Sequence, residues 1–180
     1  LSGSDSKTGT TSANAVKTLD KAKQLVTAGG TIYITGSSLN ITSDTTISGN
    51  ITIKRDSSLS ASKSMIMVEN GATLTLENVT LDGASSGQLV YAQEGNLVIN
   101  AGTKLCNSQV AAIRITAGTL TMNGGEIYNN RGKYESDCGA VEVGRMLGAA
   151  TFVMNGGKIY NNTSGGESAP GAIHVDKDCS

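Results

Sequence analysis

The stretches TLTMNGGEIYNN (119–130) and TFVMNGGKIYNN (151–162) are two copies of one phrase. Each copy joins an alternating apolar segment to a glycine pair, followed by a shorter apolar segment that ends in two asparagines. Self-similarity at a period of about 20–50 residues is typical of solenoids, in which each repeat packs only on its neighbours. The two copies therefore predict a stack of repeats.

Alternating apolar segments like those of the two copies also occur earlier in the chain. Their last Ile, Leu or Met residues form a column with intervals of 19, 23, 23, 23 and 32 residues: Ile34, Ile53, Leu76, Ile99, Met122 and Met154. The residue two positions earlier is apolar in every segment. Because side chains alternate with period two along a strand, both members of each pair are expected to point inward.

Two further features recur after these segments. An apolar position is followed two residues later by Gly83, Asn107, Asn129 and Asn161. The asparagines predict an internal ladder, because asparagine tolerates left-handed backbone and its amide can bond a stacked neighbour. A third strand then closes each repeat, with the segments 66–68, 90–92, 113–115, 141–143 and 173–175.

The composition fits thin stacked layers. The 180 residues include 23 glycines, one proline, one phenylalanine and no tryptophan, so aliphatic side chains must form the core. The net charge of −1 gives no broad field for nucleic acid or an anionic membrane. No apolar run approaches the roughly 18 residues of a membrane span, so we expect neither nucleic-acid binding nor membrane insertion.

Three short parallel strands per repeat predict an all-β fold, a right-handed parallel β-helix of about six coils. The repeated phrases resemble the pectate-lyase-like superfamily, and more narrowly they are similar to repeats in large surface proteins of Gram-positive gut bacteria. The resemblance implies a secreted or cell-surface bacterial protein with an exposed groove in which saccharides commonly lie. It does not fix an activity, because that superfamily holds lyases, hydrolases, adhesins and passive stalks.

In the first 30 residues, the apolar positions have the spacing of a helix instead of a strand. Val16, Leu19, Ala22, Lys23 and Leu25/Val26 have helical spacing after Ser12 or Asn14 as N-cap, and Gly29-Gly30 end the pattern. We expect residues 1–30 to form a polar segment and a helix that caps the open end of the first coil. Residues 31–180 would form the coils, which we expect to continue, with further domains, beyond Ser180.

Long loops interrupt the regular spacing near the C-terminal end. They are the segments 131–139, 144–150 and 163–171, and long loops on a regular scaffold are common places for binding residues. Beside them, the outward positions of the third strands read Met67, Tyr91, Arg114, Glu142 and His174. We therefore predict that a glycan or host-surface ligand contacts Tyr91, Arg114, Arg131, Tyr134, Glu135, Glu142 and His174, with Asp137 in the same loop.

Other interpretations of this surface stay open. Glycoside hydrolysis needs two carboxylates about 5–9.5 Å apart, which Glu142 with Asp137 or Glu135 could supply if the loop folds back. The chain would then be the N-terminal part of a glycoside hydrolase or polysaccharide lyase. Alternatively, Arg114 and Glu142 form a surface ion pair and the chain is a passive stalk.

The cysteines do not indicate a cofactor. Cys106, Cys138 and Cys179 match neither a redox pair nor a zinc site, so we expect no metal and no cofactor. Cys106 takes the outward position that Tyr128 and Tyr160 hold in later repeats. A bridge between Cys138 and Cys179 would require both segments to fold toward each other.

Overall fold

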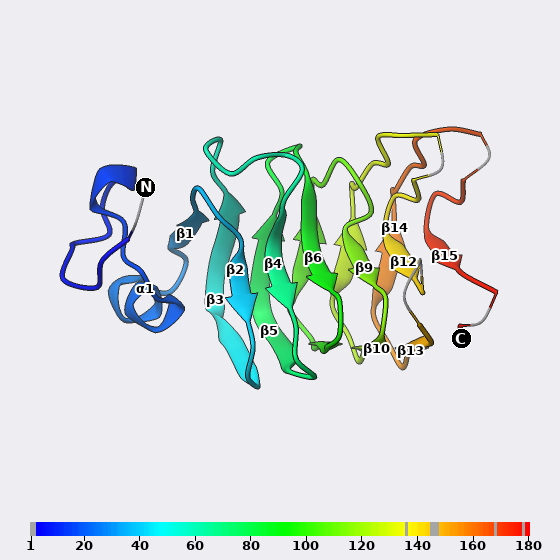
Figure 1. Ribbon diagram of the computed structural model, residues 1–180, viewed down its shortest axis with the longest axis horizontal. Coiled ribbons are helices and arrows are strands. Elements are labelled where there is room, and N and C mark those ends of the chain that lie inside the picture. The colour runs from blue at the N-terminus through cyan, green and yellow to red at the C-terminus, as the bar shows by residue number, and fades with distance from the viewer. Residues whose placement is uncertain (1–2, 136, 145–147, 168, 178) are drawn as a thin grey trace.

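The computed structural model describes residues 3–135, 137–144, 148–167, 169–177 and 179–180. Its strands form two parallel sheets in which successive passes of the chain lie side by side (Figure 1). Sheet A contains β1 (Thr31–Ile34), β3 (Thr45–Arg55), β5 (Thr73–Asp82), β7 (Asn96–Ile99), β8 (Lys104–Cys106), β10 (Gly118–Met122), β11 (Glu126–Tyr128), β13 (Ala150–Met154) and β14 (Lys158–Tyr160). Sheet B contains β2 (Leu39–Ile41), β4 (Ser64–Val68), β6 (Gln88–Ala92), β9 (Ile113–Ile115), β12 (Val141–Val143) and β15 (Ile173–Val175).

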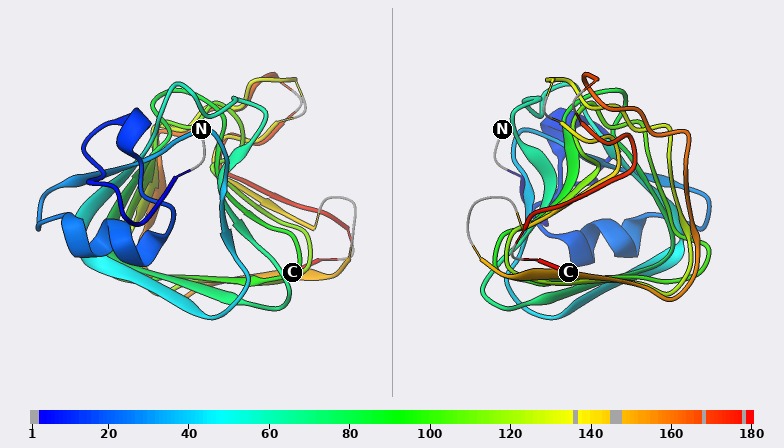
Figure 2. Two further views of the ribbon diagram at one scale, coloured as in Figure 1. Left: turned by 60° about the vertical axis from the view of Figure 1, so that its left-hand side comes forward. Right: turned by 90° about the vertical axis from the view of Figure 1, so that its right-hand side faces the viewer.

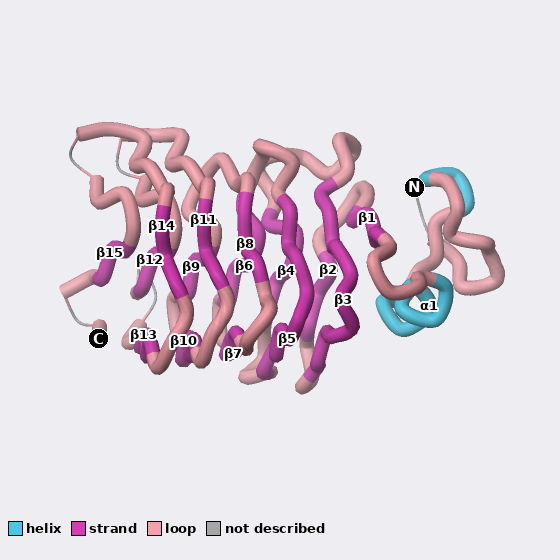
Figure 3. The backbone as a smooth tube through the Cα atoms, turned by 180° about the vertical axis from the view of Figure 1, so that it is seen from behind, coloured by secondary structure: helices cyan, strands magenta, loops and turns pink. Residues whose placement is uncertain are grey.

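Sheet A is curled because β3 and β5 each cross a corner of the molecule (Figure 2). The first part of β5 pairs with β7 and its last part pairs with β8. Asn50 and Asn78 lie at these corners with φ of 50° and 51°, a left-handed conformation that asparagine tolerates. Seen from behind, β3, β5, β8, β11 and β14 lie side by side on one wall (Figure 3). This largely β, parallel arrangement is compatible with a β-solenoid.

Aliphatic side chains fill the interior in columns. Leu74, Leu97 and Leu120 occupy one register position of β5, β7 and β10, and all three are fully buried. Their sequence neighbours point outward, as period-two alternation requires. The expected core of thin aliphatic layers and the predicted third strands, all of which lie in sheet B, are therefore confirmed.

The predicted register is wrong in the first two repeats. Ile47, not Ile53, shares the register position of Leu76, whereas Ile53 lies between Ile32 and Leu81. The physical reason is that β3 carries two alternating segments separated by the irregularity between Ser48 and Ile51. The column expected from the sequence puts Ile53, in the second segment, beside Leu76, where the structure has Ile47 of the first segment.

This register puts a cation inside the molecule. Arg55 is the partner of Ile34 and is buried. Its guanidinium donates to four backbone carbonyls, those of Leu59, Ser60, Lys63 and Gln88. Arg55 thus binds three carbonyl groups of the 56–63 connection from inside, and burial lowers its pKa.

The two asparagines that end each repeated phrase have different roles, one in the bend and one in an amide contact between repeats. Asn107, Asn129 and Asn161 have φ of 60°, 55° and 53°, which confirms the left-handed bend. Asn129 and Asn161 are exposed, however, so the expected internal ladder is not built from them. The buried amide contact belongs to the next residues, because Asn130 Nδ2 donates to Asn162 Oδ1 at 2.9 Å.

The N-terminal helix is shorter than expected. α1 spans Leu19–Leu25 with Thr18 as its N-cap, so the predicted N-caps Ser12 and Asn14 are wrong. Those two residues bound a separate 3₁₀ turn, η1 (Ser12–Asn14). The Asp5 carboxylate fixes the segment directly before α1, because it accepts hydrogen bonds from the backbone N–H groups of Lys17 and Thr18.

α1 lies at the β1 end of the sheets (Figure 1). Its residues Leu19 and Ala22, with Val26 just beyond, are partly buried against the core. Among the described residues, no helix has the length and apolarity needed to cross a membrane.

Replacing Asn130 with alanine should lower the free energy of unfolding by about 1–3 kcal/mol, because it leaves the Ser108 N–H and the Leu105 carbonyl without this amide. Asn123→Ala is the matched control. Asn123 belongs to an exposed ladder with Asn100 and Asn155, where water can replace the lost bonds. Guanidinium unfolding of both variants measures the difference, and equal losses would contradict the role assigned to Asn130.

Candidate functional site

The predicted outward column exists on sheet B. Register places Met67 beside Tyr91, Tyr91 beside Arg114, Arg114 beside Glu142, and Glu142 beside His174. Asn40 precedes Met67 in the same column. The strands impose this order, because on β4, β6, β9 and β12 the residues on either side of the column member are held in the core. That these side chains bind a ligand stays a prediction.

The centre of the column is an ion pair. Arg114 Nε donates to Glu142 Oε2 at 2.5 Å. The Arg114 side chain is 30% exposed, but that of Glu142 is only 1% exposed, so this is not the surface pair that the sequence suggested. A buried carboxylate requires compensation by a cation or by hydrogen bonds, and Arg114 supplies both.

Asp137 and Cys138 lie directly before β12. Asp137 is 6% exposed, its side chain accepts the Tyr134 N–H, and its carbonyl accepts the Gly165 N–H. Cys138 is fully buried and its thiol donates to the Val141 carbonyl at 3.1 Å. Burial, with the nearby Glu142 carboxylate second, raises the pKa of Cys138 to about 12. This cysteine therefore stays a neutral thiol at physiological pH.

The remaining column members differ in exposure. Tyr91 and His174 are half-buried. The His174 ring nitrogen Nδ1 is buried and has no hydrogen-bond partner among the described residues. Tyr91 and His174, like Arg114, are therefore partly exposed members of the column beside the loops.

The two longest loops are stacked on each other. The Gly132 N–H donates to the Thr163 carbonyl, and the Gly139 N–H donates to the Gly171 carbonyl. In Figure 2 the segments 131–139 and 163–171 leave the same corner side by side. A side chain at Gly165 would collide with the Tyr134 backbone, so close stacking requires glycine there. Residues 136, 145–147 and 168 of the predicted loops lie outside the described residues.

Tyr134 is the most exposed aromatic residue of this region, at 60%. Lys133 Nζ lies 5.1 Å from the centre of its ring, within cation–π range. Arg131 and Glu135 are also exposed on this loop. The predicted loop residues therefore reach solvent, whereas the Glu142 and Asp137 side chains do not.

Two contributors were missed by sequence reasoning. Lys133 was overlooked although a basic residue directly beside an aromatic one is a signal for cation–π contact. The sequence indicates neither disulfide nor metal chemistry for Cys138, and it does not reveal that this thiol lies near the buried Glu142 carboxylate. All three cysteines are free. The described residues contain no group of three or more His, Cys, Asp or Glu placed to hold a metal ion.

Comparison with protein-family models, with curated proteins and with solved structures gives no match to this chain. The resemblance to the pectate-lyase-like superfamily thus rests on the repeated residues alone.

The buried Cys138 thiol should make the free energy of unfolding depend on pH in the alkaline range. Because the pKa is raised in the folded state, the thiol of the unfolded chain, with a pKa of about 8.5, loses its proton at lower pH. Stability should therefore fall as pH rises from about 8.5 toward 12, by at most about 1.4 kcal/mol per pH unit for this group. Cys138→Ser removes this contribution and should flatten the pH dependence, which unfolding at pH 7, 9 and 10.5 would measure. Identical slopes for both proteins would contradict the burial of a neutral thiol.

Proposed function

We propose that this chain is a right-handed parallel β-helix of about six coils with an N-terminal capping helix, related to the pectate-lyase-like superfamily. It belongs to a secreted or surface-attached bacterial protein that carries further domains. Its role is noncatalytic: it acts as an adhesin-like module that binds a glycan or a host-surface ligand. The ligand contacts Tyr134 and Arg131 on the stacked loops and Tyr91, Arg114 and His174 on sheet B.

The stacked loop pair is the observation that carries this proposal. Tyr134 exposes a large ring, and its loop is held by backbone hydrogen bonds to the next loop instead of hanging free. Tyrosine suits such a surface because its ring is apolar and its hydroxyl is a hydrogen-bonding group. A loop ordered before binding loses less conformational entropy when the ligand arrives.

The ion pair supports binding rather than catalysis. A general acid or base has to reach the proton it transfers. Glu142 and Asp137 are both buried, and Glu142 is engaged by Arg114. This disfavours the two as the acid and base of a glycosidase. It favours a structural role in which Glu142 fixes the Arg114 guanidinium while the exposed part of Arg114 faces solvent.

A glycan array probed with the intact chain tests the proposal. Tyr134→Ala should weaken binding by at least about tenfold, the typical effect of losing an aromatic anchor. Tyr33→Ala is the control, because Tyr33 is similarly exposed but lies on β1 at the opposite end. The proposal would be contradicted if the chain bound no glycan or surface ligand, or if the Tyr134 variant bound equally well. The remaining interpretation would then be a passive stalk.

A charge-conserving double variant tests the part played by sheet B. Removing one partner of a buried ion pair typically costs about 3–5 kcal/mol, because the other charge is left unpaired. Replacing both Arg114 and Glu142 with glutamine avoids this cost. Weaker glycan binding with an unchanged circular dichroism spectrum would support the column as part of the surface. Release of sugars by the protein, lost in Glu142→Gln, would instead favour the carbohydrate-active enzyme.

A further inference from the structure

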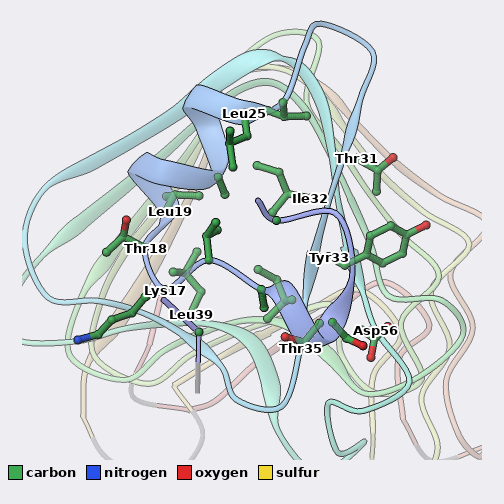
Figure 4. Close-up of a pocket in the computed structure, with 18 of the residues that line it drawn as sticks. Lys17, Thr18, Leu19, Leu25, Thr31, Ile32, Tyr33, Thr35, Leu39 and Asp56 are labelled. Carbon is green, nitrogen blue, oxygen red and sulfur yellow. The ribbon is translucent and has the colours of Figure 1, made fainter. Parts of the chain in front are cut away.

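A hollow with one apolar wall lies at the end of the molecule that the loops do not occupy. Its volume is about 770 Å³, and it lies between α1 and the first strands, partly open to solvent (Figure 4). Leu19 and Leu25 of α1 face it from one side, and Ile32 and Leu39 face it from the other. Ile32 is buried, so the N-terminal segment shields the first strand without filling the space in front of it.

Hydroxyl-bearing residues share the lining of the hollow with these apolar side chains, so it offers both hydrocarbon and hydrogen-bonding groups. Its charged lining residues are Lys17 and Asp56, and in Figure 4 both charged ends point away from its centre. Asp56 also accepts a hydrogen bond from the Ser58 N–H. The Thr18 hydroxyl is engaged with Lys21 N and the Asp5 carboxylate. Where the apolar wall atoms lack neighbours, they gain dispersion contacts from an apolar guest.

We propose that this hollow binds the aliphatic chain of a fatty acid or similar single-chain lipid. The volume lies within the range of about 300–1,000 Å³ found for small-molecule sites. A flexible alkyl chain matches the part of the wall that leucine and isoleucine side chains form. The hydroxyl-bearing segment 8–12 also lines the hollow and provides hydrogen bonds for a head group.

This inference is independent of glycan binding. α1 and β1 lie at one end of the sheets, whereas β12, β14 and the stacked loops lie at the other (Figure 1). A lipid held here would complete the packing between the N-terminal segment and the first strand. It would therefore raise the thermal stability of the chain without any change at Tyr134.

Fluorescence of cis-parinaric acid provides the direct test, because the chain has no tryptophan to interfere. We expect saturable binding of one probe per chain, and displacement by dodecanoate and tetradecanoate. Each two methylene groups removed from the competitor should weaken displacement by about tenfold, since every buried methylene contributes a similar increment. The neutral alcohol 1-dodecanol should compete as well if the alkyl chain dominates. Displacement by dodecanoate alone would assign the specificity to a carboxylate head group.

Filling the hollow should abolish binding. Ala22→Phe and Ala15→Leu each add carbon atoms to a lining residue, and we expect at least a tenfold loss of probe affinity from either. Ala13→Phe is the matched control, because Ala13 lies in the same N-terminal segment, is exposed and does not line the hollow. Circular dichroism identifies a filling variant that fails to fold, in which case the other one decides.

The other apolar end of the molecule is the competing site for a lipid probe. Val153, Met154, Tyr160 and Val175 are exposed there, so Val153→Lys should weaken adventitious binding at that end and leave the hollow unaffected. Three results would overturn the proposal: no saturation below about 100 µM, loss of binding in Val153→Lys, or full binding by folded Ala22→Phe and Ala15→Leu. Glycan binding by the same preparations would report separately on the proposed function.

Discussion

Parallel strand pairing in strict register is the constraint on which the rest of the structure depends. Each pass of the chain bonds its backbone to the pass before it, so residues at equivalent positions are brought to within about 4.8 Å of each other. Like side chains then meet like, as in the stacked rings of Tyr128 and Tyr160, whose centres lie 5.3 Å apart. The same pairing joins Asn130 to Asn162 and brings Arg114 to Glu142. A slip of one residue would turn every apolar column toward solvent.

Register also explains why charged groups are found in unexpected surroundings. Arg55 points into the interior because its position is inward, and its two terminal nitrogens donate to carbonyl groups of the 56–63 connection and of Gln88. Glu142 faces outward from sheet B but is covered, and Arg114 on the adjacent strand compensates its charge. In both cases the sheet fixes the backbone first, and neighbouring groups then satisfy the charge. The exposed loop residues and the partly exposed Arg114 are left as groups of this end that can meet a ligand.

Much of the fold could be predicted because the later repeats share a phrase that aligns them residue by residue. Met122 and Met154 stand in equivalent phrases, and the structure pairs them. The earlier repeats lack that phrase, so Ile53 could be assigned to a column only by its apolar neighbours. Two alternating segments within β3 fitted equally well, and the bulge that separates them leaves little trace in the sequence beyond Gly49-Asn50.

The candidate site was harder to predict for a different reason. Period-two alternation gives the side of the sheet on which Glu142 lies, but not what covers it. Its burial depends on where the long loop before β12 returns, and that loop places Cys138 close to the Glu142 carboxylate. The hollow beside α1 depends likewise on how the N-terminal segment closes over Ile32. Long-range packing of this kind leaves no pattern in the local sequence, whereas a turn does, as asparagine shows at position 129.

Disulfide trapping across sheet A tests the register most directly. Thr46 and Thr75 are partners on neighbouring strands, and parallel neighbours lie within the Cα separation of about 4.4–6.8 Å that a disulfide requires. Thr52 is instead the partner of Thr80 and lies farther along the sheet from Thr75. Under mild oxidation, peptide mass spectrometry should find the 46–75 bridge in Thr46→Cys/Thr75→Cys and no 52–75 bridge in Thr52→Cys/Thr75→Cys. The reverse pattern would contradict the register and with it the columns on which the two proposed sites depend.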